Sequence, residues 1–197
     1  MSKFHTNASI GRYCSIASGV SIGGFRHPIE AVSMSSAVFN PHREFVNAYI
    51  EDIERSDGKD FHDKFQKVSV PQKGTNITIG HDCWIGSDVK LNRGIVIGHG
   101  SVIASASLIT KDVPPYSIVG GNPGKIIKYR FPPELREALI ESQWWNYELR
   151  DLHNLPLGNP EKFLLELSQV KSDLRPYSPQ SKPLWDIIVT ALSPASR

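Results

Sequence analysis

A six-residue period of apolar residues constrains this chain more than any other feature. Residues six apart lie on different faces of an α-helix, whereas short strands separated by tight turns can point every sixth side chain toward one axis. The residue after each aliphatic is usually Gly or Ala, and the fifth position of each hexad is small or aliphatic. The period therefore predicts a parallel β-solenoid. Its aliphatic series is Ile79, Ile85, Leu91, Ile97, Ile103 and Ile109.

An earlier run, Phe4, Ile10, Ile16 and Ile22, has the same period. The spacing between Ile22 and Ile79 is not a multiple of six, so residues 24–76 are expected to leave the coil as an insertion. Such insertions in solenoids often carry function. Within it, apolar residues between Phe45 and Ile53 have helical spacing, which predicts a short amphipathic helix ended by Asp57-Gly58.

The two cysteines, Cys14 and Cys83, both fall at the fifth position of a hexad. Two cysteines cannot build a disulfide framework, and this pair lacks the CxxC spacing of a zinc site. We interpret both as reduced, small core residues of the solenoid.

After Val113-Pro114-Pro115 the repeat is expected to stop, and Pro132-Pro133 opens a helical region. One apolar stripe predicts a helix there, and a shorter helix should follow Gly158-Asn159-Pro160. These helices are expected to cap the last coil, which otherwise exposes unpaired backbone groups. The predicted division is a solenoid domain over 1–131 with its insertion, and a helical cap and tail over 132–197. The first stripe is Leu135, Leu139, Trp145, Leu149 and Leu152, and the second is Phe163, Leu164 and Leu167.

Charge and hydropathy exclude several classes of function. The formal net charge is only +2 and no long run of Lys and Arg occurs, so a nucleic-acid partner is not expected. No apolar run approaches the roughly 18 residues that span a bilayer, and no leader sequence is evident. We therefore expect a cytoplasmic protein without a membrane span. An apolar tail segment, residues 184–192, is expected to pack on its own or a neighbouring subunit.

Two stretches resemble the hexapeptide-repeat acyltransferases, in the branch of xenobiotic and sugar O-acetyltransferases related to the hexapeptide type of chloramphenicol acetyltransferase. The first runs from Asn76 to Gly86, and the second contains Thr110-Lys111-Asp112-Val113-Pro114-Pro115 and Val119-Gly120-Gly121-Asn122-Pro123-Gly124-Lys125, with Trp144-Trp145 further on. The resemblance implies an all-β, left-handed parallel β-helix with an excursion loop and a C-terminal α-helical cap. It also implies a homotrimer with active sites between adjacent subunits, and acetyl-CoA as the acetyl donor.

Acetyl transfer to a hydroxyl needs a base that takes the alcohol proton, and neutral imidazole suits this role near pH 7. Of the seven histidines, His27 is our candidate, because it lies where Gly23-Gly24 releases the chain into the insertion. In the resembling enzymes the catalytic histidine occupies this junction. The alternative is a turn histidine that bonds only backbone. His42 and His62 also lie in the insertion. They either line the acceptor pocket or are solvated loop residues.

The later coils and the loop after them are the expected donor site. A pantetheine arm can lie along a groove lined by small residues and bond backbone amides there. Indole at position 84 would flank it, and a cationic stretch without acidic residues after Val113 suits the CoA phosphates. The small residues that suit the pantetheine arm are Gly86, Ser87, Ala104 and Ser105. The resemblance suggests Trp84 beside the thioester or pantetheine, with a packing role as the alternative. It also implies CoA contacts at Thr110, Lys111, Lys125 and Lys128, with Asn122 shaping the loop near the nucleotide. Each lysine is alternatively a solvated surface charge.

No metal site is expected. His81 and His99 share the third hexad position and should stack one coil apart, which suggests a metal. The γ-class carbonic anhydrases have this fold and bind zinc through three histidines, two of them close together on one coil. Because the repeats here contain no such close pair, we interpret both histidines as surface polar residues.

Three functions remain open. The first is an acetyl-CoA-dependent O-acetyltransferase with a sugar or surface-polysaccharide hydroxyl as acceptor, which the absence of a long N-terminal extension favours. The second is the same chemistry on an antibiotic such as chloramphenicol or a streptogramin. The third is a non-catalytic assembly module, because fold alone does not fix function.

Overall fold

The computed structural model describes residues 8–23, 26–40, 42–57, 68–70 and 76–178. Phe4, His62 and the apolar tail segment 184–192 lie outside this part of the chain. The chain divides into two compact units, Met1–Arg130 and Phe131–Arg197, which are taken in turn.

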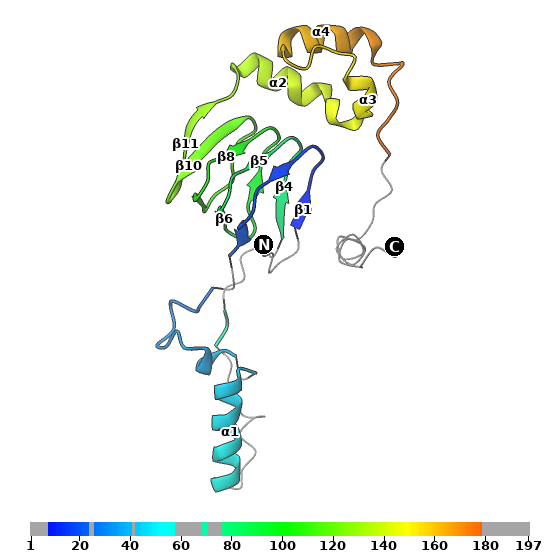
Figure 1. Cartoon of the computed structure of the whole chain (residues 1–197). Coiled ribbons are helices and arrows are strands. Elements are labelled where there is room, and N and C mark those ends of the chain that lie inside the picture. Colours follow the sequence, from blue (N-terminus) through cyan, green and yellow to red (C-terminus); the bar gives the residue numbers. More distant parts are fainter. Residues whose placement is uncertain (1–7, 24–25, 41, 58–67, 71–75, 179–197) are drawn as a thin grey trace, which may run out of the picture. The chain divides into compact units, whose positions relative to one another are not determined.

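The first unit is a coil of very short strands arranged in three sheets (Figure 1). Successive coils stack in parallel, with Ile10 beside Ile79 in one sheet and Ile16 beside Ile85 in the next. Three parallel sheets on a hexapeptide repeat are typical of a left-handed β-helix, so the predicted solenoid is confirmed. The strands are β1 (Ala8–Ile10), β2 (Ser15–Ile16), β3 (Ser21–Ile22), β4 (Ile77–Ile79), β5 (Trp84–Ile85), β6 (Lys90–Leu91), β7 (Val96–Ile97), β8 (Val102–Ile103), β9 (Leu108–Ile109), β10 (Ser117–Gly121) and β11 (Gly124–Tyr129).

The three sheets have the orders β1-β4-β7, β11-β10-β8-β5-β2 and β3-β6-β9. Only the β10–β11 pair is antiparallel among the ladders of the described strands. The aliphatics of the predicted series face the axis, where Ile85 and Ile97 are fully buried. From Val20 onward the fifth hexad position is buried too, and there the hydroxyls of Ser101 and Ser107 donate to the carbonyls of Pro114 and Ala104.

The coil continues further than predicted. The repeat was expected to stop at Val113-Pro114-Pro115, yet Val113 pairs with Ile97 and Val119 lies in register with Ile103. Both inward residues follow their partners by 16 positions instead of 18, because the connection from Ile109 to Val113 is two residues shorter than a hexad. A change of register, which a strict six-residue search misses, therefore conceals the last coil.

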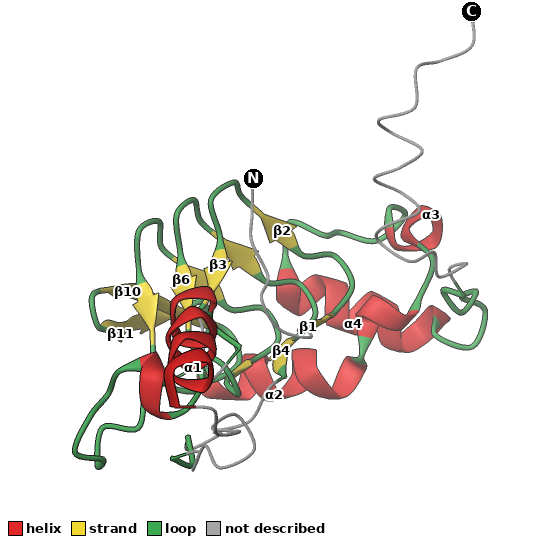
Figure 2. Ribbon diagram, turned by 90° about the horizontal axis from the view of Figure 1, so that it is seen from below, coloured by secondary structure: helices red, strands yellow, loops and turns green. Residues whose placement is uncertain are grey.

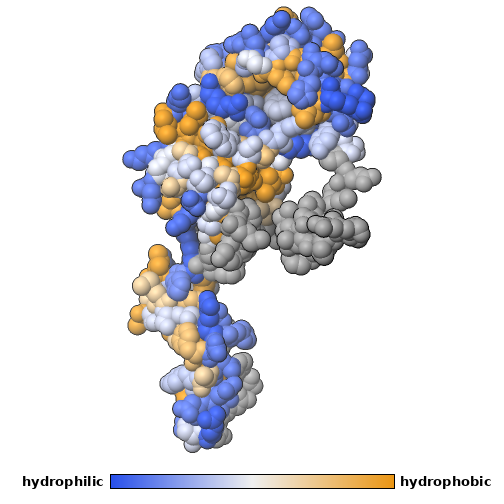
Figure 3. Space-filling model, viewed as in Figure 1, coloured by the Kyte–Doolittle hydropathy of each residue, from blue (hydrophilic) through white to orange (hydrophobic). Residues whose placement is uncertain are grey.

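The insertion contains the predicted helix, α1 (Glu44–Asp57), preceded by the 3-10 turn η1 (Ser36–Val38). Val46 and Ile50 are buried, whereas Phe45 and Tyr49 on the same predicted face are exposed. Exposed apolar side chains also occur nearer the base candidate, at Ile29 and Met34. Hydrophobic and hydrophilic residues thus alternate over the surface of this segment (Figure 3).

The second unit is helical, and its first predicted helix is broken (Figure 2). Gln143 adopts a left-handed conformation with φ 48°, which ends α2 before the paired tryptophans. Trp145 is buried and Trp144 packs edge-on against Phe163 of α4. Whether this unit caps the coil stays a prediction. Its elements are α2 (Pro133–Ser142), η3 (Trp144–Asn146), α3 (Leu149–Leu152) and α4 (Pro160–Val170).

No helix in the described part of the chain is long and apolar enough to cross a membrane.

Candidate donor and base sites

His27 lies just after the third strand, in the first described residues of the insertion. Its side chain is exposed, and its Nδ1 is 2.6 Å from the carbonyl oxygen of Met34. A carbonyl oxygen only accepts hydrogen bonds, so Nδ1 carries the proton and Nε2 keeps its lone pair. The ring also meets Phe39 edge-on, with centroids 5.2 Å apart and planes at 83°. Two local contacts therefore orient an imidazole whose Nε2 is ready to accept a proton.

Met34 and Phe39 were missed in the sequence. The contact with Met34 is made by its backbone carbonyl, which leaves no signal in side-chain composition. Phe39 is one of several aromatics in the insertion, with nothing in its spacing to connect it with a histidine twelve residues earlier. Both partners of His27 shown by the described residues lie within the insertion.

Two of the candidate donor-binding residues lie in one row across the strands, on the outer face of the five-stranded sheet. Trp84 is in register with Val102, Val102 with Ile118, and Ile118 with Lys128. The Trp84 side chain is 59% exposed, so its indole stands free on this face. Neighbouring strands are about 4.8 Å apart, which places Trp84 and Lys128 roughly 14 Å from each other along the row.

A bulge in the hairpin β10–β11 brings the second lysine to the same face. The register shifts between Ile118 and Val119, so that Lys128 opposes Ile118 and Lys125 opposes Gly120. Cross-strand partners share a face, and the bulge therefore places two lysines spaced three apart on one side. The hairpin turn itself contains Asn122, which precedes Pro123 in a cis peptide.

The small residues Gly86, Ser87, Ala104 and Ser105 form one stacked corner. The Gly86 amide donates to Ile103, and the Ser87 and Ser105 hydroxyl oxygens are 3.3 Å apart across adjacent coils. A Cβ at position 86 would lie 2.6 Å from the backbone nitrogen of Ser105, so only glycine permits this coil spacing. Gly86 is buried, and the surface of this corner comes from the small residues Ser87, Ala104 and Ser105.

Thr110 and Lys111 lie at a different corner. They follow β9, in the sheet that contains β3 and β6, and the carbonyl of Ile109 accepts from the Asn92 amide. Lys111 is exposed and Thr110 is half-buried. The described geometry thus groups Trp84, Lys125 and Lys128 on one face, and does not bring Thr110 and Lys111 into that row.

Arg130 is part of the cationic stretch in the sequence, but in the structure its side chain binds other residues of the coil. Its Nη1 is 3.0 Å from the Asp82 carboxylate and 2.7 Å from the Gly100 carbonyl, and the guanidinium lies 5.5 Å from the Tyr116 ring centroid. Asp82 has a positive φ of 56°, so this ion pair holds a strained corner. Arg130 therefore stabilises the coil and is not counted among the phosphate-binding candidates.

His81 and His99 stack as expected, with ring centroids 5.1 Å apart and planes at 12°. They are half-buried rather than surface residues. The His99 Nδ1 accepts from the His81 amide, and the His81 Nδ1 accepts from the Arg12 amide. Burial lowers the pKa of both rings below the usual value, so both stay neutral near pH 7. Within the described residues, no group of three or more His, Cys, Asp or Glu side chains is placed to hold a metal.

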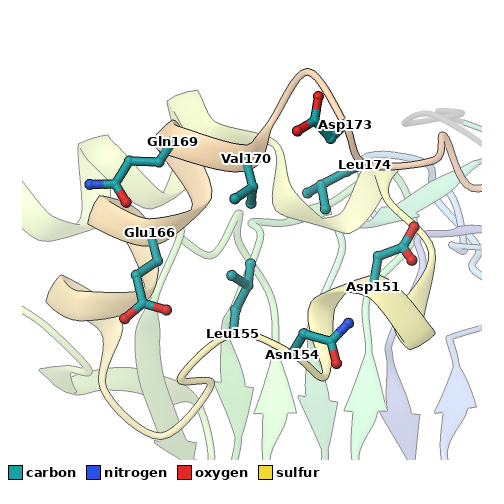
Figure 4. A pocket seen from close by; sticks show the side chains of 8 residues that line it. All are labelled: Asp151, Asn154, Leu155, Glu166, Gln169, Val170, Asp173 and Leu174. Carbon is teal, nitrogen blue, oxygen red and sulfur yellow. The ribbon is translucent and has the colours of Figure 1, made fainter.

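A pocket of about 460 Å³ lies within the helical unit, lined from α3, α4 and the following loop (Figure 4). Two of its three acidic side chains are paired with cations, and the third, Asp173, accepts from the Ser172 hydroxyl. Arg175 bonds Asp151 and lowers the pKa of that carboxyl to about 2, and Lys162 lies 3.6 Å from Glu166. The pocket offers no group suited to acyl transfer.

The coil of six-residue repeats is the structural feature that relates this chain to known proteins. Residues 76–111 match the family described as bacterial transferase hexapeptide (six repeats). The chain is 42% identical over 146 residues to the chloramphenicol acetyltransferase of Klebsiella aerogenes, covering 73% of this chain and 61% of that protein. It is 35% identical over 162 residues to a probable macrolide acetyltransferase of Lysinibacillus sphaericus, covering 80% of each.

The chain therefore belongs to the hexapeptide-repeat acetyltransferases. Among solved structures, a hexapeptide-repeat acetyltransferase of Vibrio cholerae O1 biovar eltor, complexed with acetyl coenzyme A, is 23% identical with a TM-score of 0.40. That match covers 64% of this chain and 50% of the other. The matched region spans about three fifths of the length of the chloramphenicol acetyltransferases.

Proposed function

We propose that this chain is an acetyl-CoA-dependent O-acetyltransferase that acetylates a hydroxyl group of an antibiotic, with His27 as the general base. The observation that carries the proposal is the orientation of His27. The Met34 carbonyl accepts a hydrogen bond from Nδ1–H, which leaves Nε2 as the proton acceptor of the ring. Family membership supplies the reaction class.

The chemistry follows from this tautomer. Nε2 of His27 accepts the proton of the acceptor hydroxyl as its oxygen attacks the thioester carbonyl of the donor. The Met34 carbonyl bonds the imidazolium that results and keeps the ring from turning. The same Nε2–H then protonates the departing thiolate, which returns His27 to its neutral form. Transfer is direct within a ternary complex and needs no acetyl-enzyme.

The donor-binding residues are proposed on the outer face and the small-residue corner of the coil. The row from Trp84 to Lys128 provides an indole at one end and a cation at the other, separated by apolar Val102 and Ile118. This order of groups suits a ligand with a thioester, an amide arm and phosphates. Thr110, Lys111 and Asn122 are proposed on the family resemblance alone.

The acceptor is proposed to be an antibiotic rather than a sugar. The chain is similar to a chloramphenicol acetyltransferase over 146 residues and to a probable macrolide acetyltransferase over 162 residues, which favours an antibiotic over a sugar as acceptor. Apolar side chains near His27, including Ile29, Val32 and Met34, are strongly exposed. A largely apolar acceptor would cover them, whereas a sugar would leave them in water.

We further propose the homotrimer of the family as the working form. The two described partners of His27 are local, so residues of an adjacent subunit are free to supply the donor face. Sedimentation of the purified chain tests this, with a trimer expected.

The acceptor assignment is tested with a panel of hydroxyl compounds at fixed acetyl-CoA. Release of free CoA thiol is expected with chloramphenicol or a macrolide, and kcat/KM for these should exceed that for maltose or galactosides by at least tenfold. A larger kcat/KM for the sugars would overturn the antibiotic proposal. Absence of CoA release with every hydroxyl, together with no effect of CoA on the melting temperature, would favour the assembly module.

Replacing both hairpin lysines tests the donor face. In the double variant Lys125→Ala, Lys128→Ala we expect KM for acetyl-CoA to rise on the order of tenfold, about 1.4 kcal/mol, with little change in kcat. The matched control is Lys90→Ala, since Lys90 is also exposed on a strand but faces outward from another sheet. An equal rise in both variants would mean only general charge attraction.

A further inference from the structure

The two cysteines were expected to be equivalent core residues, and the structure separates them. Cys83 is 1% exposed, whereas Cys14 is half-buried at the first coil, which ends its sheet at β2. Each thiol donates to a carbonyl of the next coil, Cys14 to Gly80 at 3.0 Å and Cys83 to Gly98 at 3.2 Å. One thiol of the pair is therefore accessible and the other is protected.

The backbone holds the two residues side by side. Ser15 is in register with Trp84, and its amide donates to the Cys83 carbonyl at 2.8 Å, so Cys14 and Cys83 adjoin on neighbouring coils. Neighbouring strands lie about 4.8 Å apart, within the roughly 4.4–6.8 Å between the Cα atoms of disulfide-bonded cysteines. We propose that Cys14 and Cys83 form a reversible disulfide by exchange with a low-molecular-weight disulfide.

The two thiols differ in the way that an attacking and a resolving cysteine should. The neighbouring Cys83 thiol lowers the pKa of Cys14 to about 7, below the usual value of a thiol, which favours the nucleophilic thiolate. The neighbouring Cys14 thiol raises the pKa of Cys83. That cause disappears once the Cys14 sulfur is bonded to another sulfur and no longer carries charge.

The exchange balances in two steps. The Cys14 thiolate attacks one sulfur of oxidised glutathione, forms a mixed disulfide and releases one glutathione thiolate. Cys83 then loses its proton and attacks the Cys14 sulfur, which releases the second glutathione. Two protein thiols are oxidised and one glutathione disulfide is reduced to two thiols. The new bond joins the coil before the insertion to the coil after it, and closes a loop that contains His27.

Purified reduced protein is incubated with oxidised glutathione and analysed by mass spectrometry under non-reducing conditions. We expect a monomeric product lighter by two hydrogen atoms, with a Cys14–Cys83 peptide, which dithiothreitol returns to the reduced mass. Because the closed loop is long, the melting temperature should rise by several degrees. Two glutathionyl groups on the wild-type chain, a disulfide between chains, or free thiols at every glutathione ratio would overturn the proposal.

Single variants assign the roles. Cys83→Ser should stop at one glutathionyl group on Cys14, whereas Cys14→Ser should gain none, because Cys83 is buried. If either serine variant fails to fold by circular dichroism, partial alkylation of the wild-type chain by iodoacetamide decides the same point. Peptide mapping should then show Cys14 labelled first. Equal labelling of the two thiols would contradict the assigned order.

Discussion

Replacing His27 by glutamine is expected to lower kcat for acetyl transfer by about 10²–10⁴-fold, since the amide cannot accept the hydroxyl proton. The substitution keeps a donor that can reach the Met34 carbonyl, so the insertion should remain folded. The measurement is CoA release under saturating acetyl-CoA and acceptor. The increase in melting temperature produced by CoA should persist, because the proposed donor residues all lie on the coil and its hairpin.

His153→Gln is the matched control, because His153 is an exposed histidine in the helical unit. It should leave both kcat and the CoA effect unchanged. Wild-type turnover in the His27 variant would remove His27 from the mechanism. Loss of the CoA effect together with turnover would mean that the substitution had disturbed the donor site or the fold.

Ile97→Ala should be the most destabilising single substitution proposed for the coil, at about 2–5 kcal/mol in the free energy of unfolding. Ile97 is fully buried and contacts the coils on both sides through its register with Ile79 and Val113. Alanine there leaves a cavity on the axis, because the backbone of adjacent coils is already in contact and cannot close it.

The control for this substitution is its neighbour. Val96 belongs to the same two-residue strand but points outward and is 47% exposed, so Val96→Ala should change the free energy of unfolding by no more than about 0.5 kcal/mol. Urea denaturation followed by circular dichroism measures both. Similar losses in the two variants would mean that the inward and outward positions of the hexad had been assigned wrongly.

The axis of the coil was predictable because each hexad repeats one physical requirement, an aliphatic side chain that fills the interior. The same regularity explains why the last coil was missed. Val119 satisfies the requirement, but the frame has already shortened by two residues between Ile109 and Val113. The break at Gln143 was missed for a related reason, since an apolar stripe continues across it and only the backbone angle shows the turn.

The candidate site was predictable only where a residue type itself signals chemistry, as at His27 and Trp84. Its geometry depends on long-range register that no local pattern encodes. The bulge at Ile118 places Lys125 and Lys128 on the same face of the sheet. Arg130 follows them in the sequence but pairs with Asp82, 48 residues earlier in the chain. Likewise, the identical hexad positions of Cys14 and Cys83 conceal that one is at the end of a sheet.

The return of the chain into register after the insertion also bears on how such proteins diversify. Ala8 pairs with Ile77 and the Gly23 amide bonds Leu91, so main-chain bonds of the coil secure both sides of the insertion independently of its sequence. Doubling the length of such a loop costs only about 0.6 kcal/mol in closure entropy. The insertion can therefore change in sequence and length at little cost to the coil that carries it.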